Sequence, residues 1–276
     1  YVLKNKLGLL VKDEKIIDED RELFVLTGLN KYSVKQDIIE AYFKNHSFEG
    51  LKTLLKAQDR LPEGWPGNQA FKQISKSAQT FGDQVLEKQG ERAGEEVKID
   101  LEIDDLKLTG EITGYYPPLF LDFRFGRKRA KDLVAWWIKH VILSIQISSE
   151  INSVLLTWKD EKLGQDELGV LESPEIMLKE LLAGYREGIQ KIGCFFPRSS
   201  FKFAEQIYKK DSTEDKAVEK AQKEWQPNDY SSVPSESEDK YTKLVTGDKN
   251  PLEYSSFKDE ARRFWEPFFN AYNPKN

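Results

Sequence analysis

The hydrophobic period of this chain changes near residue 97, and that change constrains the fold more than any other feature. From Gln69 to Gln89, large apolar side chains recur at the spacing of one face of a helix. From Val97 to Ile103, every second residue is apolar and the residues between are charged. Such alternation is typical of a strand with one face buried and the other in water. The two periods in adjacent segments predict helices packed on a sheet.

The segments after this change predict two further strands, a helix, a fourth strand and another helix. The alternation resumes over Leu106–Ile112, after a turn at Asp104-Asp105. A third strand, Leu119–Phe125, has apolar residues on both faces and is expected at the centre of the sheet. The remaining elements are expected at Ala130–Ser149, Val154–Trp158 and Ser173–Glu187. This order predicts an α/β (α+β) core with a mixed sheet flanked by helices.

Three parts are expected along the chain: a helical N-terminal segment (residues 1–92) that packs on the core, the α/β core (93–198), and a helical C-terminal extension (199–276). The N-terminal helices are predicted at Val34–Lys44, with Ser33 as N-cap, at Phe48–Ala57 and at Gln69–Gln89. The aromatic-rich end, Phe257–Tyr272, is expected to dock on the core. The chain starts in structured-looking sequence without Met, so we expect a fragment of a longer protein.

Charge and composition limit the classes of function. The net charge is −5, so any contact with DNA would need a local basic patch. Cys194 is the only cysteine, which excludes an internal disulfide and a cysteine-rich zinc site and fits a reducing, intracellular compartment. No apolar run approaches the length that crosses a bilayer, so no membrane partner is expected.

The stretch from Gly110 to Leu143 has the layout of a nuclease core, with an apolar strand that ends in Asp-x-basic and leads into a helix. Nucleases of the PD-(D/E)xK superfamily place an acid and a lysine two residues apart on this strand, and a second acid on the strand before it. Here Asp122 and Arg124 occupy the first two positions. The second acid of such a nuclease would stand at position 113, where this chain has Thr113. Glu111 lies on the same face of the strand, about 7 Å further back.

Two readings of these residues remain open. In an active Mg²⁺ nuclease, Glu111, Asp122 and Arg124 would be the catalytic residues. Arginine is a poor replacement for lysine, because its guanidinium stays protonated and makes rigid multidentate contacts. In the second interpretation the sheet is nuclease-like but has lost its activity, and Asp122 and Arg124 pair with each other or with charges on a helix. We expect the second reading, with no cofactor and no bound metal.

One dense basic run follows the third strand, and it is the candidate surface for DNA or for an acidic partner. It contains Arg124, Arg127, Lys128, Arg129 and Lys131. These side chains suit contacts to phosphates, but the run equally fits a solvated strand-to-helix turn. Nearby, His140 has no second histidine or cysteine at ligand spacing and is expected to be a hydrogen-bonded core or interface residue. Trp136 and Trp137 are adjacent, so we expect only one of them to face the core.

Several short motifs, in the same order, resemble the C-terminal domain of RecC, the gamma subunit of the RecBCD helicase–nuclease (exodeoxyribonuclease V). The apolar strand and basic turn of that family resemble Phe120–Phe125 and Arg129-Ala130-Lys131-Asp132 here, and its helix with Trp-Ile-x-His resembles Trp137-Ile138-Lys139-His140. Its L-x-x-Y helix start resembles Leu29-Asn30-Lys31-Tyr32, and its L-P-x-G turn resembles Leu61-Pro62-Glu63-Gly64. Its helix followed by F-P-x-S resembles Leu181–Gly188 with Phe196-Pro197-Arg198-Ser199.

The resemblance implies a nuclease-like domain without catalytic activity of its own. Its partners would be the helicase–nuclease beta subunit and the helicase alpha subunit of a bacterial, cytoplasmic complex that processes DNA ends for recombination repair. Thr113 and Arg124 agree with the loss of activity on chemical grounds. Two alternatives stay open: a residual Mg²⁺-dependent nuclease that uses Glu111 and Asp122, and a local DNA-binding module at residues 124–131.

Overall fold

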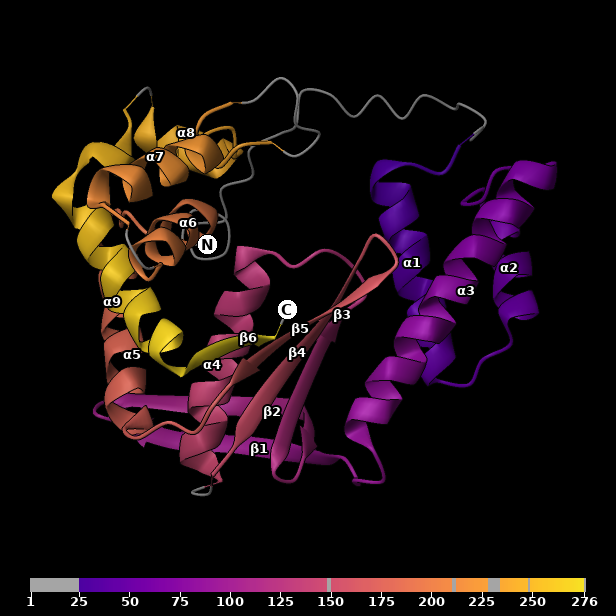
Figure 1. Ribbon diagram of the computed structural model, residues 1–276, viewed down its shortest axis with the longest axis horizontal. Coiled ribbons are helices and arrows are strands. Elements are labelled where there is room, and N and C mark those ends of the chain that lie inside the picture. The colour runs from indigo at the N-terminus through magenta and orange to yellow at the C-terminus, as the bar shows by residue number, and fades with distance from the viewer. Residues whose placement is uncertain (1–24, 148–149, 210–211, 228–233, 248, 276) are drawn as a thin grey trace.

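The protein contains a six-stranded mixed sheet whose spatial order follows the sequence. The computed structural model describes residues 25–147, 150–209, 212–227, 234–247 and 249–275. The strands β3 and β4 are parallel and are joined by the helix α4, while all other neighbours are antiparallel (Figure 1). The strands are β1 (Glu95–Ile103), β2 (Leu106–Tyr116), β3 (Leu119–Arg124), β4 (Asn152–Lys159), β5 (Lys162–Leu168) and β6 (Tyr272–Lys275).

Helices cover both faces of the sheet. One face carries α1 and α3, with α2 behind them, and the other carries α4, α5 and α9 (Figure 1). The helices α6, α7 and α8 lie beyond one end of α4 (Figure 1). The helices are α1 (Gly28–Phe43), α2 (Phe48–Ala57), α3 (Gly64–Gln89), α4 (Ala130–Gln146), α5 (Pro174–Gln190), α6 (Pro197–Ile207), α7 (Glu214–Trp225), α8 (Lys240–Thr246) and α9 (Ser255–Ala271), with a short 3₁₀ turn, η2 (Pro251–Glu253). No helix in the described part of the chain is both long and apolar enough to cross a membrane.

The predicted α/β order is confirmed, but two strands were missed. The strand β5 is polar and contains Gly164, Gln165 and Asp166, so it lacks the apolar alternation that marks β1. The strand β6 has four residues and pairs with β5 only after α9 has brought the chain back. Tertiary pairing, and not local sequence, makes both segments strands.

Two predicted N-terminal boundaries were wrong. The helix α1 begins at Gly28 with Thr27 as N-cap, so Ser33 lies inside the helix, where its hydroxyl accepts a hydrogen bond from Arg60. The helix α3 begins at Gly64, inside the segment predicted as a turn, because a proline in the first turn of a helix removes no helical hydrogen bond. The first 24 residues of the predicted N-terminal segment lie outside the described residues.

The prediction that only one tryptophan of the pair faces the core was also wrong. Trp136 and Trp137 are both fully buried in one cluster, and both rings contact Phe268 of α9 edge-to-face. The helix α4 lies between the sheet and the returning C-terminal helix α9, so more than one face of it is buried and both tryptophans are covered. The expected docking of the aromatic C-terminal segment is confirmed by the burial of Trp265 and Phe268 in the same cluster.

Candidate functional site

Asp122 projects from β3 toward α4, where its charge is balanced. Its Oδ2 accepts a hydrogen bond from Lys139 Nζ at 2.8 Å, and its Oδ1 accepts the N–H of Phe123 at 2.9 Å. The neighbouring Phe123 points to the other face and contacts Phe43 and Phe81. Lys139 is therefore the counter-ion of the carboxylate that the sequence offered as a candidate metal ligand.

Arg124 is held by the start of the same helix. Its Nε lies 3.3 Å from Asp132 Oδ2 and donates to the Arg127 carbonyl at 3.0 Å. Asp132 also accepts the backbone N–H of Arg129 at 3.1 Å, so its carboxylate caps α4. Burial raises the pKa of Asp132 above its usual range, against the opposing effect of Arg129. The prediction that Asp122 and Arg124 pair with helix charges is confirmed.

Glu111 lies apart from Asp122. It sits where β2 pairs with β1, opposite Lys98, and its neighbour Ile112 is buried in the cluster that contains α4. Glu111 therefore points to the opposite face of the sheet from Asp122. A hydrogen bond and charge repulsion from Glu96 raise its pKa. Throughout the described residues, no three His, Cys, Asp or Glu side chains are grouped so that they could hold a metal ion.

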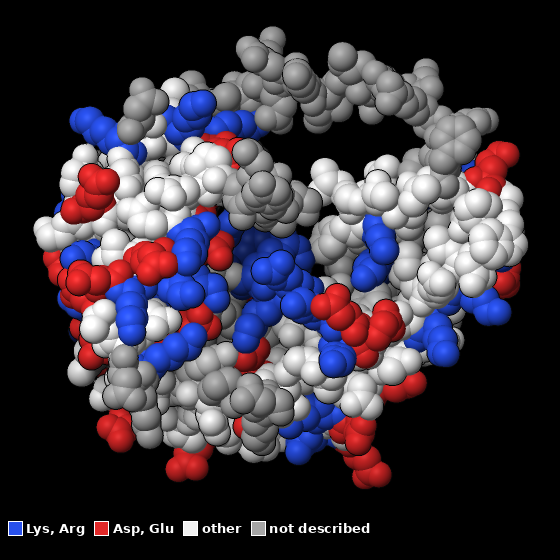
Figure 2. Space-filling model, turned by 45° about the horizontal axis from the view of Figure 1, so that its top comes forward, with Lys and Arg blue, Asp and Glu red and all other residues white. Residues whose placement is uncertain are grey.

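The predicted basic run forms one side of a large open cleft of about 1340 Å³. The other sides come from α1, from the β4–β5 hairpin, and from α6 and α7. Figure 2 shows Lys and Arg side chains gathered in the hollow at the centre of this face. Twelve Lys or Arg residues line the cleft against five Asp or Glu: Lys31, Lys35, Arg124, Arg127, Lys128, Arg129, Lys131, Lys159, Lys162, Arg198, Lys202 and Lys223, against Asp160, Asp166, Glu205, Glu224 and Glu236.

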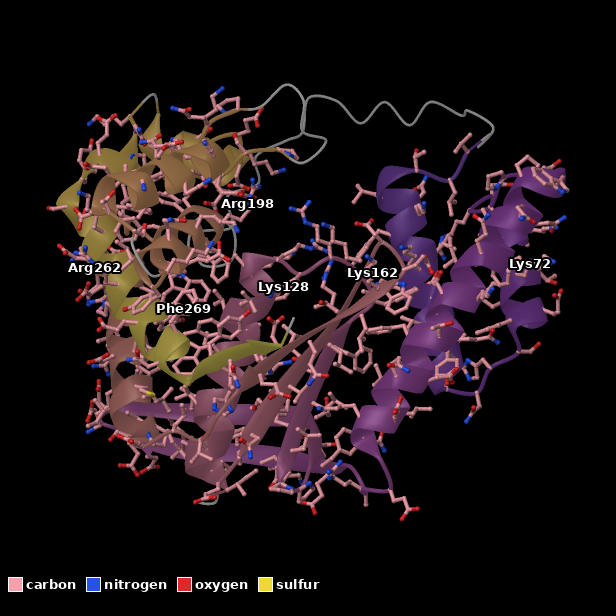
Figure 3. All side chains as sticks on the ribbon, viewed as in Figure 1. Lys72, Lys128, Lys162, Arg198, Arg262 and Phe269 are labelled. Carbon is pink, nitrogen blue, oxygen red and sulfur yellow. The ribbon has the colours of Figure 1, made fainter. Side chains whose placement is uncertain are left out.

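Distant parts of the sequence supply these cations. Lys128 follows β3, Lys162 begins β5 and Arg198 is the second residue of α6. The three lie around one gap in Figure 3, whereas Lys72 lies apart from them at the right of that view. The excess of positive charge in the cleft contrasts with the net charge of −5 of the whole chain. Sequence reasoning found only the run 124–131, because the other cations carry no shared motif and meet only in the folded chain.

Some of these cations form ion pairs with other described residues, and others form none. Arg127, Lys131 and Lys162 form no ion pair with another described residue, and Arg129 lies over the Tyr32 ring, 5.4 Å from its centroid. Burial and the charge of Lys31 lower the pKa of Lys35, which is the expected effect of a crowded positive surface. The cleft therefore offers charge-assisted donors to a ligand with many negative oxygens.

Lys128 has a structural role as well as its place in the cleft. Its Nζ donates to Asp166 Oδ1 at 2.7 Å and to the Tyr272 hydroxyl at 3.1 Å, and the same hydroxyl donates to Asp166. Burial and the charge of Asp166 raise the pKa of Tyr272. The network joins the basic turn, β5 and the C-terminal strand β6, so the end of the chain helps to hold the cleft in shape.

His140 lies away from the cleft and is confirmed as a hydrogen-bonded core residue. Its Nδ1 is 2.6 Å from Ser153 Oγ, and its Nε2 is 3.0 Å from the Gly169 carbonyl oxygen. Burial lowers its pKa to about 4, so the ring is neutral near pH 7. Both ring nitrogens are occupied, which agrees with a structural role.

Fold and site together define a class: an α/β domain with a mixed sheet, a strand carboxylate neutralised by a helix lysine, and a basic cleft whose lining includes Arg124 of the same strand. The model of the RecC C-terminal domain family matches residues 1–208, and the chain belongs to this family. This confirms the family indicated by the short motifs.

Two RecC subunits are among the relatives. The chain is 23% identical to the RecBCD enzyme subunit RecC of Escherichia coli (strain K12), over 98% of this chain and 24% of that protein. It is 21% identical to the RecBCD enzyme subunit RecC of Buchnera aphidicola subsp. Acyrthosiphon pisum (strain APS), over 97% of this chain and 25% of that protein. The chain thus spans about a quarter of the length of these relatives.

Proposed function

We propose that this chain is a non-catalytic, nuclease-like domain of an exodeoxyribonuclease V gamma chain. In this role it binds DNA in the basic cleft and supports assembly with a helicase–nuclease beta subunit and a helicase alpha subunit during recombination repair. The observation that carries the proposal is the combination of a neutralised acid and a basic cleft. Lys139 holds Asp122, while Arg127, Lys131 and Lys162 remain available for phosphates.

The chemistry supports binding without cleavage. A Mg²⁺ nuclease needs carboxylates that converge on the metal and a group that orients water. Here Glu111 and Asp122 point to opposite faces, and Arg124 stands at the lysine position with its guanidinium against Asp132. The nuclease-like strand layout would then serve as a scaffold that presents the basic turn at the end of β3.

Salt-dependent DNA binding tests the proposal. Fluorescence anisotropy with single-stranded and double-stranded oligonucleotides would measure Kd for the wild type and for Arg127→Ala/Arg129→Ala at several salt concentrations. If both arginines contact phosphates, the double substitution lowers the slope of log K against log salt by about 2 and weakens binding to both kinds of DNA. A nicking assay with Mg²⁺ and Mn²⁺ on the same samples should show no cleavage.

The matched control is Lys56→Ala/Lys72→Ala. It removes the same charge from α2 and α3, outside the residues that line the cleft. Equal loss of binding in both double variants would show that only the overall charge matters and would overturn the cleft as the binding site. Cleavage abolished by Asp122→Ala would overturn the non-catalytic assignment.

A further inference from the structure

A second hollow, of about 760 Å³, lies among α5, α8 and α9, and its character is opposite to that of the basic cleft. These helices lie on the side of the molecule away from α1, α2 and α3 (Figure 1). We refer to this hollow as the apolar groove. Much of its lining is aliphatic or aromatic, including Ile138, Met177, Leu181, Ile192, Phe195 and Val245.

Two of the three helices around this groove, α5 and α8, are poorly buried among the described residues. Of the 17 residues of α5, only Leu178 is fully buried, and α8 has no fully buried residue. Two large apolar side chains of the groove lining, Ile189 and Ile192, are 40% and 69% exposed. Helices in proteins gain most of their stability from burial of an apolar face, so α5 and α8 present the kind of surface that a partner covers.

The floor of the groove permits close approach of another backbone. Gly188 of α5 is open, since a Cβ added there would meet no atom within 4 Å. Gly184, one helical turn earlier, is covered by Arg263, whose guanidinium nitrogen would lie 3.1 Å from an added Cβ. Behind them, Trp137 is fully buried, lines the groove, and its indole N–H has no acceptor within the described chain. Small residues beside large apolar ones form a groove between ridges, into which the side chains of a second helix can pack.

The charges around the groove are mainly negative. Four acids line it, Glu180, Glu187, Asp239 and Glu260, against Lys191 and Arg263. Both bases already pair with Glu187. Among the described residues, Glu180 is exposed and forms no ion pair, and Asp239 accepts the Tyr241 and Thr242 N–H groups at the start of α8. An acidic rim disfavours DNA and anionic lipid and favours a basic protein segment.

We propose that the apolar groove binds an amphipathic helix of a partner subunit. The apolar face of that helix would pack over Gly188, Ile189 and Ile192, and its Lys or Arg side chains would lie beside Glu180 and Asp239. The inference rests on the proposed function, because it assigns one surface to the assembly role. It separates the two roles in space, with DNA in the basic cleft and a protein helix in the groove.

Gly188→Arg is the variant that tests the groove. The side chain would add bulk and charge to the groove lining without strain, because the position is helical, exposed and free of neighbours. Gly50→Arg on α2 is the matched control, since it makes the same change at an exposed helical glycine outside the groove. The intact gamma chain that contains this domain would be titrated with the other two subunits, with complex formation followed by sedimentation velocity.

Gly188→Arg is expected to weaken assembly by more than about tenfold, while Gly50→Arg assembles like the wild type. Glu180→Lys is expected to weaken assembly by about two- to fivefold, with a flatter salt dependence. Cleft binding of oligonucleotides should be unchanged in all three variants, so failure of this inference and failure of the proposed function give different results.

Hydrogen exchange on the wild-type subunits keeps the test independent of the folding of any variant. The amides of α5 and α8 should exchange more slowly in the assembled complex than in the free gamma chain. Unchanged exchange there, or wild-type assembly by Gly188→Arg, would overturn the inference. It would equally be overturned if slower exchange in α5 and α8 came from self-association of the free gamma chain, because the occupant would then be a second copy.

Discussion

The ammonium group of Lys139 lies 2.8 Å from Oδ2 of Asp122 and joins the helix α4 to the strand β3. The side chains of both residues are partly exposed, 42% for Lys139 and 29% for Asp122, so water screens the pair. The contact therefore contributes little to stability. Its main consequence is chemical, since it neutralises the carboxylate that the sequence offered as a candidate metal ligand.

Removal of this lysine tests whether it alone suppresses metal binding. We expect Lys139→Met to lower the free energy of unfolding by about 0.5–1 kcal/mol, as measured by urea denaturation. Calorimetric titration of Mg²⁺ into the variant should still give no stoichiometric binding, because Glu111 points to the other face of the sheet. Stoichiometric Mg²⁺ binding by Lys139→Met that disappears in Lys139→Met/Asp122→Asn would contradict this expectation. It would favour the alternative of a residual Mg²⁺-dependent nuclease.

The Tyr272 hydroxyl links β6 to the basic cleft through Asp166 and Lys128. Tyr272→Phe keeps the ring that stacks on Phe268 and removes only the hydroxyl. We expect a loss of about 1–2 kcal/mol in the free energy of unfolding, because Asp166 is buried and loses one of its two donors. Tyr254→Phe, at an exposed site, is the control. Equal stability of the two variants would show that the hydroxyl adds nothing.

His140 gives the stability of the domain a defined pH dependence. Its folded pKa is about 4, below the ordinary value of 6.5, so the unfolded chain binds a proton more readily between these values. The contribution of neutral His140 to the free energy of unfolding is complete above pH 6.5 and is lost as the pH falls toward 4. Between pH 7 and pH 5 the loss is about 2 kcal/mol, at about 1.4 kcal/mol for each pH unit below 6.5.

Urea unfolding at pH 7 and pH 5, for the wild type and for His140→Gln, checks this contribution. Burial also raises the pKa of Asp132 and of Glu236, and those groups change stability in the opposite direction as the pH falls. The difference between wild type and variant isolates the histidine, because both proteins keep the two carboxyl groups. If the variant loses as much stability as the wild type between the two pH values, the buried histidine is not the cause.

Local patterns in the sequence were sufficient for the order of the central elements and for the family. The alternation at Val97–Ile103 and the helical period at Gln69–Gln89 come from residues that are neighbours in the chain, and each predicts one element directly. The pairing of Asp122 and Arg124 with a helix could also be predicted from the sequence, because residues two apart on a strand share a face and the next helix packs over that face.

Only the tertiary structure decided the cleft, the strand β6 and the burial of both tryptophans. The twelve cations of the cleft run from Lys31 to Lys223, and only the run from Arg124 to Lys131 stands out in the sequence. Trp136 and Trp137 are both buried because α9 returns over α4, and Tyr272 becomes part of a strand because β5 has a free edge beside it. These features depend on contacts between segments far apart in the chain, and a local pattern of residues does not predict such contacts.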